Sequence, residues 1–115
     1  MSELRALQAE VQRILGPLAH PRIGAMLALS EEVGELSKLV LEREVYAQPP
    51  QEEALKGELC DVLVCALELA NLYGIDLQDA LLTKLRDLEG RAPRWAEELG
   101  PALADARRRM DSALE

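Results

Sequence analysis

The segment from Leu59 to Leu72, LCDVLVCALELANL, is the feature that most limits how this chain can fold. As a helix it is apolar on nearly every side, and such a helix is normally buried between neighbouring helices or in a subunit interface. Leu and Ala supply 39 of the 115 residues, whereas Val, Ile and Thr together supply 10 and Phe is absent. Leu and Ala favour helices, and the scarce residue types favour strands. The sequence therefore predicts an all-α protein with this segment as a central helix.

Proline and glycine residues divide the chain into helices. These belong to one domain, residues 1–115, because a chain of this length supports a single core. Helices are expected at residues 2–15, 21–46, 51–73 and 76–90. Pro49 and Pro50 separate the two longest helices, and Gly74 is a natural helix stop before the N-cap residue Asp76. Pro93 and Pro101 are each expected to restart a short helical piece. This pattern predicts a bundle of four to five helices with two long central antiparallel helices.

Charge and targeting signals exclude several classes of protein. The chain has 21 Asp plus Glu against 13 Lys plus Arg, a formal charge of −8, which argues against binding to long nucleic acids by phosphate neutralisation. No stretch of about 20 residues lacks charge, so a membrane span is not expected. The first residues carry acids and no apolar signal region, so export is not expected either. We therefore expect a cytoplasmic protein.

The two cysteines, Cys60 and Cys65, lie in the apolar segment. On one helix their side chains point about 140° apart, so they cannot easily form a disulfide with each other. We expect buried, reduced thiols, which suit the reducing cytoplasm.

Four carboxylates occupy positions where apolar residues would be expected. Glu58 shares its helical stripe with Val62 and Leu69, and Asp61 follows one turn later. In the preceding long helix, Glu32 falls on an apolar stripe and Glu35 follows one turn later. A carboxylate in such a place is costly unless it is paired or bound to a metal.

Antiparallel packing of the two long helices would place ExxE opposite ExxD. A single ExxE on a helix is usually a solvated face, but two such pairs on apolar stripes would repel each other strongly. Few Lys or Arg residues lie on these faces to offset the repulsion. Hard divalent cations take oxygen ligands, and Mg²⁺ is commonly completed by water and substrate phosphates. The pattern therefore favours a Mg²⁺ site formed by Glu32, Glu35, Glu58 and Asp61.

Several segments together resemble a known family. EEVGEL at 31–36, GELCDVL at 57–63, LANLYGIDL at 69–77 and Lys84 are similar to the MazG-type all-α nucleoside triphosphate pyrophosphohydrolases. The resemblance covers roughly residues 23–93. EVGEL followed by Lys84, Arg91 and Pro93 resembles the small dCTP-pyrophosphatase-like branch of that family.

The resemblance implies an enzyme that hydrolyses a nucleoside triphosphate to the monophosphate and pyrophosphate, in a house-cleaning role, with Mg²⁺ or alternatively Mn²⁺. It implies that the four carboxylates named above are metal ligands and that Glu31 and Glu32 are the catalytic carboxylates, Glu31 as a supporting ligand or a base for the attacking water. Lys84 and Arg91, two turns apart on one helix, would contact the phosphates. His20 and Asn71 are candidate nucleotide contacts, although His20 also reads as a helix-start residue and Asn71 as a polar residue near a helix end.

Two other functions stay open from the sequence. Phosphoribosyl-ATP pyrophosphohydrolase of histidine biosynthesis shares the EExxE and ExxD pattern, and a non-catalytic helical oligomerisation or regulatory module is a third reading. Four helices of modest length would leave one face of the segment 59–72 uncovered, and such a face is usually covered by another subunit. We therefore expect a homodimer or homotetramer with the site near the interface, a nucleotide as the partner molecule, and no contact with long nucleic acid or membrane.

Overall fold

The computed structural model describes residues 3–49 and 51–112, and every regular element in these two ranges is helical. The elements are α1 (Glu3–Leu15), the 3₁₀ turn η1 (Gly16–Leu18), α2 (Arg22–Glu44), α3 (Glu52–Leu72) and α4 (Leu77–Ser112). The predicted all-α fold is confirmed, and none of the described helices is long and apolar enough to cross a membrane.

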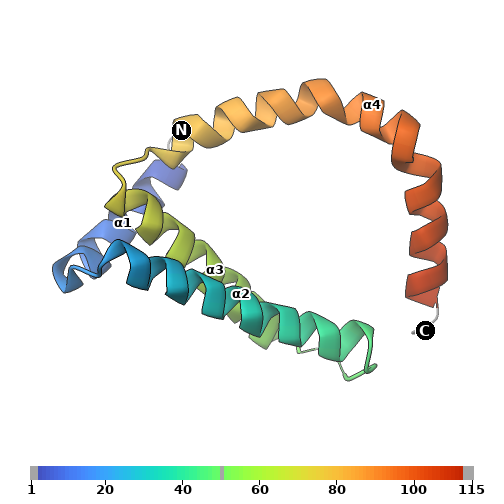
Figure 1. Cartoon of the computed structure of the whole chain (residues 1–115), viewed down its shortest axis with the longest axis horizontal. Helices are drawn as coiled ribbons and strands as arrows, with labels where there is room; N and C mark the ends of the chain where they lie inside the picture. Colours follow the sequence, from blue (N-terminus) through green and yellow to red (C-terminus); the bar gives the residue numbers. More distant parts are fainter. Residues whose placement is uncertain (1–2, 50, 113–115) are drawn as a thin grey trace.

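The two central helices, α2 and α3, lie side by side and run in opposite directions (Figure 1). Their contact is the most extensive in the chain, and α1 packs on α3 beside it. Ala25 on α2 is buried, and Val62 and Leu69, which share the predicted stripe of Glu58 on α3, are half-buried. The predicted pair of long antiparallel helices is therefore confirmed.

Gly74 and Asp76 determine where α3 ends and α4 begins. Gly74 has a φ of +66°, in the left-handed region that glycine adopts without strain. The Ile75 N–H donates to the Ala70 carbonyl at 2.9 Å and the Gly74 N–H donates to the Asn71 carbonyl at 3.1 Å, the two hydrogen bonds of a Schellman motif. Two residues later, Asp76 caps α4 by accepting a hydrogen bond from the Gln78 N–H at 3.0 Å.

Helix α4 differs from the prediction, because it continues through Pro93 and Pro101 to Ser112 instead of breaking into short pieces. A proline inside a helix removes one backbone hydrogen bond and its ring crowds the carbonyl four residues earlier. A helix can relieve that crowding by bending, and α4 bends in its second half (Figure 1). Leu, Ala, Arg and Glu dominate the flanking sequence and favour continuation of the helix.

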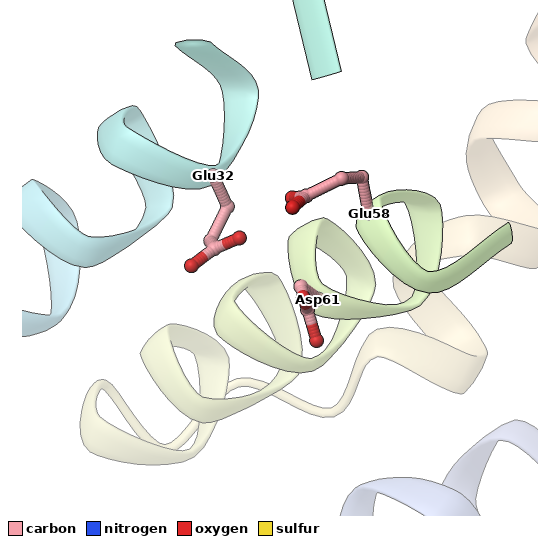
Figure 2. A group of neighbouring side chains, drawn as sticks. All are labelled: Glu32, Glu58 and Asp61. Atoms are coloured by element: carbon pink, nitrogen blue, oxygen red, sulfur yellow. The ribbon is translucent and has the colours of Figure 1, made fainter. Parts of the chain in front are cut away.

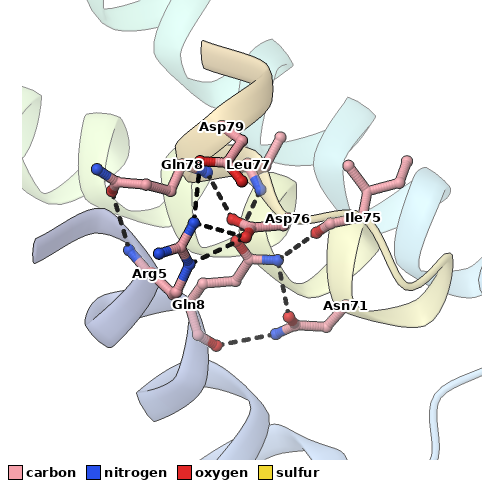
Figure 3. A network of polar contacts seen from close by, with 8 residues as sticks. All are labelled: Arg5, Gln8, Asn71, Ile75, Asp76, Leu77, Gln78 and Asp79. Carbon is pink, nitrogen blue, oxygen red and sulfur yellow. Dashed lines mark hydrogen bonds and ion pairs between the residues drawn. The ribbon is translucent and has the colours of Figure 1, made fainter. Parts of the chain in front are cut away.

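A clamp formed by Arg5 and Gln8 of α1 holds the junction between α3 and α4 (Figure 3). The buried Gln8 side chain donates to Asn71 Oδ1 at 3.0 Å and to the Ile75 carbonyl at 2.6 Å. Its Oε1 accepts a hydrogen bond from the Leu77 N–H at 3.1 Å. We call Arg5 and Gln8 the α1 clamp, because together they fix the direction in which α4 leaves the other helices.

The Arg5 side chain completes this clamp on the α4 side. It forms ion pairs with Asp76 at 2.7 Å and Asp79 at 3.1 Å. From this junction α4 extends away from α2 and α3, and its main contact among the described residues is with α1 (Figure 1).

Candidate active site

Three of the four predicted metal ligands lie together between α2 and α3 (Figure 2). One carboxylate oxygen each of Glu32, Glu58 and Asp61 lies within 4.8 Å of the others. Glu32 and Glu58 are half-buried, and Asp61 is exposed. We call these three residues the carboxylate group, and they come together because ExxE on α2 faces ExxD on the antiparallel α3.

Glu58 is the most constrained member of the carboxylate group. Its Oε2 atom is buried and has no hydrogen-bond partner among the described residues. Its pKa is raised above the ordinary value, first because the protonated acid can share a hydrogen bond with Glu32, then because of burial and repulsion from Glu32, Asp61 and Glu35. The site therefore disfavours a further negative charge, and among the described residues the Glu58 Oε2 atom has no hydrogen-bond donor and no cation beside it.

The other two predicted acids of α2 stand at the edge of this site. Glu35 is exposed and lies close enough to Glu58 to contribute to the rise in its pKa. Glu31 is also exposed and is not part of the carboxylate group. Carboxylate oxygens are the donors preferred by Mg²⁺ and Mn²⁺. The orphaned Oε2 of Glu58 and this all-oxygen donor set fit a hard divalent cation.

A second polar pair continues the site along α3. His20, just before α2, has its Nδ1 atom 2.6 Å from Oε2 of Glu68, whose exposed fraction is 8 %. Cys65 lies between this pair and the carboxylate group: burial raises the pKa of its thiol, and the negative charges of Glu32, Glu68 and Asp61 raise it further. A small cavity of about 50 Å³ adjoins the pair and is lined in part by His20, Glu68 and Leu72.

The pairing of Glu68 with His20 was not predicted from the sequence. The two residues are 48 positions apart, so no local spacing relates them. The usable signal was an acid in an otherwise apolar stripe, since a buried carboxylate requires a partner.

The remaining predicted nucleotide contacts are not in the carboxylate group. Asn71 uses its amide to bind α1, accepting from Gln8 Nε2 and donating to the Gln8 carbonyl at 3.0 Å. Arg91 forms an ion pair with Asp87 at 2.7 Å and lies 4.9 Å from the centre of the Trp95 ring. Lys84 is exposed, and within the described part of the chain no ion pair involves it. Both cations stand on α4, which leaves the α2–α3 pair (Figure 1).

Cys60 differs from the prediction of two buried thiols. It is exposed, whereas Cys65 is half-buried, and both thiols are free. The apolar surroundings of Cys60 in the sequence predicted burial, but the helix that would cover them in a closed bundle lies elsewhere in this chain.

Comparison with known proteins identifies the family of this chain. The profile of the MazG nucleotide pyrophosphohydrolase domain matches residues 23–96, which include all of α2 but its first residue, the whole of α3, and α4 as far as residue 96. No solved structure matches the chain.

Two curated relatives share much of the sequence. The dATP/dGTP diphosphohydrolase of Cyanophage S-2L is 39 % identical over 92 residues, covering 78 % of this chain and 75 % of that protein. The dCTP pyrophosphatase 1 of Mus musculus is 36 % identical over 101 residues, covering 81 % of this chain and 59 % of that protein. The profile match spans all three residues of the carboxylate group, and both relatives are hydrolases of nucleotides. The chain therefore belongs to the MazG nucleotide pyrophosphohydrolase family.

Proposed function

We propose that this protein hydrolyses a deoxynucleoside triphosphate to the monophosphate and pyrophosphate in a Mg²⁺-dependent reaction, with Mn²⁺ as an alternative cation. The observation that carries the proposal is the carboxylate group, with its buried, unpartnered Glu58 oxygen. Both relatives named above are hydrolases of deoxynucleotides. Their substrates favour this function over hydrolysis of phosphoribosyl-ATP, and the complete set of carboxylates favours it over a non-catalytic module.

In this proposal Glu32, Glu35, Glu58 and Asp61 hold the cation. When bound, Mg²⁺ would lower the pKa of a coordinated water and neutralise charge on the leaving pyrophosphate. Glu31 accepts the proton of the attacking water, with Glu32 as the second catalytic carboxylate. Water adds to phosphorus, the phosphoanhydride bond between the first and second phosphates breaks, and pyrophosphate leaves. Positioning and electrostatic stabilisation account for most of the catalysis that such a transfer requires.

Substrate recognition is assigned to residues on either side of this centre. The contact with Glu68 occupies His20 Nδ1, so Nε2 of the same ring remains available for the base or sugar. Asn71 lines the cavity beside this pair and is the second proposed nucleotide contact. Lys84 and Arg91 bind the phosphates. We further propose that the protein is a cytoplasmic homo-oligomer that acts on the nucleotide pool. Its charge of −8 disfavours binding to long nucleic acids but not to a nucleotide that carries a cation.

The test is a panel of canonical and modified nucleoside triphosphates with Mg²⁺, assayed separately for pyrophosphate and for orthophosphate. We expect pyrophosphate release from at least one deoxynucleotide, and a fall of at least about 100-fold in kcat/KM for Glu58→Gln and Asp61→Asn. Glu53→Gln is the matched control, because Glu53 is an exposed acid of the same helix that pairs with Lys56. Release of orthophosphate alone, or full activity of both site variants, would contradict the proposal.

Calorimetric titration of Mg²⁺ checks the metal site independently of turnover. Wild type and Glu53→Gln should bind the cation equally, and Glu58→Gln should bind it weakly or not at all. Equal binding by all three proteins would remove the carboxylate group from the metal site.

A further inference from the structure

His20 and Glu68 form a polar pair with one buried end and one exposed end. His20 Nδ1 lies 2.6 Å from Glu68 Oε2, the distance of a short, charge-assisted hydrogen bond. The Glu68 side chain is 11 % exposed, whereas the His20 side chain is 44 % exposed. The carboxylate is therefore the anchored member of the pair, and the imidazole is the member that a ligand can reach.

Packing alone does not account for an acid at position 68. A buried carboxylate is costly unless its oxygens are hydrogen-bonded, and His20 is its one hydrogen-bonding partner among the described residues. Replacing such a buried polar pair by apolar residues of similar volume is often neutral or stabilising. The pair is therefore expected to serve something other than the stability of α3.

The backbone on both sides of His20 is also restrained. Ala19 has a φ of +50°, in the left-handed region that costs energy for a residue with a Cβ atom, and its N–H donates to the Gly16 carbonyl at 3.0 Å. Pro21 follows with a φ of −66°, and a residue before proline is confined to extended conformations. Strain retained at one backbone position often marks a side chain that is held in place for a function. His20 is thus presented at a fixed position before α2.

The contact with Glu68 determines which nitrogen of the neutral His20 ring carries the proton. An ionised carboxylate can only accept hydrogen bonds, so the contact requires an N–H at Nδ1. A neutral imidazole has one N–H, and Nε2 is then left with a lone pair that can only accept. Glu68 therefore fixes the chemical character of the exposed edge of the ring.

The pair lies within the length of a nucleotide from the carboxylate group. Asp61, Cys65 and Glu68 occupy positions i, i+4 and i+7 of α3, so they share one face and Glu68 is about 10 Å along the helix from Asp61. A nucleotide bound by its phosphates at the carboxylate group covers that distance with its sugar and base. The cavity beside the pair has a volume of about 50 Å³, which holds water but not a base. A nucleotide would therefore meet the exposed edge of the His20 ring.

We propose that Glu68 is a positioning residue that holds His20 as the Nδ1–H tautomer, so that Nε2 accepts a hydrogen bond from a donor group of the nucleotide. This inference rests on the proposed function, because it takes the nucleotide to be bound at the carboxylate group. Away from its phosphates, a deoxynucleotide offers such a donor as an exocyclic amino group of the base or as the 3′-hydroxyl of the sugar. A base carbonyl at the same place would face the Nε2 lone pair with no hydrogen between the two atoms. The pair therefore selects nucleotides that present a donor to His20.

Nitrogen NMR tests the tautomer directly, because the chain has a single histidine. In labelled protein at about pH 8, we expect a protonated Nδ1 and a bare Nε2. Glu68→Gln should give a mixture of tautomers, since an amide can either accept from Nδ1 or donate to it, and Glu68→Leu should also lose the preference. Glu53→Gln, an exposed acid of the same helix, should match wild type.

Three results would overturn the hold of Glu68 on His20: a bare Nδ1 in wild type, protons on both ring nitrogens, or an unchanged tautomer in both Glu68 variants. Hydrolysis plays no part in this readout, so its failure is separate from failure of the proposed function.

Steady-state kinetics tests whether Glu68 acts through His20. The contact is to a part of the nucleotide that does not react, so Glu68→Leu should raise KM about 10-fold and leave kcat within about 2-fold of wild type. In a His20→Asn background, Glu68→Leu should have no further effect on KM, because both side chains act through one contact. An equal effect with and without His20 would show that Glu68 acts through packing, and an unchanged KM in Glu68→Leu would remove it from recognition.

Matched substrates identify the donor. Each of the pairs dCTP with dUTP and dATP with dITP exchanges an amino group of the base for a carbonyl, and a dideoxy analogue lacks the 3′-hydroxyl. A base donor predicts that wild type prefers the amino member of at least one pair by about 10-fold in kcat/KM, and that Glu68→Leu loses this preference. A sugar donor predicts the same pattern between a deoxynucleotide and its dideoxy analogue. Wild type without either preference, or a preference that Glu68→Leu retains in full, would overturn the role of Nε2 as the acceptor.

Discussion

Removing the polar side chain of Gln8 is the most direct test of how the α1 clamp holds α4. Gln8→Leu keeps the volume of a side chain that is 7 % exposed and deletes its three hydrogen bonds, to Asn71 Oδ1, the Ile75 carbonyl and the Leu77 N–H. Each such bond contributes about 1 kcal/mol, or more where the partner is left buried and unpaired. Water can reach the exposed Ile75, so we expect a loss of about 2 kcal/mol in the free energy of unfolding.

The assay is urea unfolding followed by circular dichroism at one fixed protomer concentration, because the stability of an oligomer depends on concentration. Gln12→Leu is the control: it makes the same substitution one turn later on α1, at an exposed residue, and should change the free energy by less than about 0.5 kcal/mol. Equal stability of the two variants would show that the α1 clamp does not hold the junction.

Further predictions concern the linker, the pH dependence and the metal. Gly74→Ala should cost about 1 kcal/mol because of its positive φ, whereas Gly57→Ala, inside α3 with open space around it, should stabilise by about 0.5–1 kcal/mol in urea unfolding. Without divalent cations, the raised pKa of Glu58 means that the native state holds the Glu58 proton more tightly than the unfolded state does. The contribution of Glu58 to the free energy of unfolding therefore falls as pH rises from 4.5 through the raised value. Glu58→Gln should remove this trend. Arg5 holds the pKa of Asp76 below its ordinary 3.8, so the ionised Asp76 stabilises the native state fully above pH 3.8. This stabilisation disappears as pH falls through the lowered value, and Asp76→Asn should abolish the loss in an acid titration. Mg²⁺ at about 100 times its dissociation constant should add about 2.7 kcal/mol to wild type and nothing to Glu58→Gln, measured by thermal unfolding with and without chelator.

The local features of this fold were predictable because each depends on residues within one or two helical turns. Helical periodicity placed Glu32 and Glu58 on the facing stripes of α2 and α3, and the break at Pro49 implied that the two helices run antiparallel. Those two facts are enough to bring ExxE against ExxD, as found. The stop at Gly74 and the cap at Asp76 were predictable for the same reason, since both depend on backbone conformation at a single position.

Features that depend on distant parts of the chain were not predictable. His20 meets Glu68 and Gln8 meets Asn71 across 48 and 63 positions, and no spacing rule connects them. The continuity of α4 was missed because the effect of an internal proline depends on whether the helix is free to bend. The exposure of Cys60 was missed because the apolar pattern of α3 indicates that its faces should be covered, but not which part of the structure covers each of them.

These observations together explain why the metal site and the stability of the fold would depend on the same helices. The carboxylate group lies in the contact between α2 and α3, the most extensive contact in the chain, where like charges oppose the packing around them. Among the described residues only three apolar ones are buried, so apolar burial does little to offset that repulsion. A cation held between the carboxylates would remove the repulsion. Metal binding should therefore stabilise the contact between α2 and α3, so chelation of the cation should lower the free energy of unfolding of wild type and leave that of Glu58→Gln unchanged.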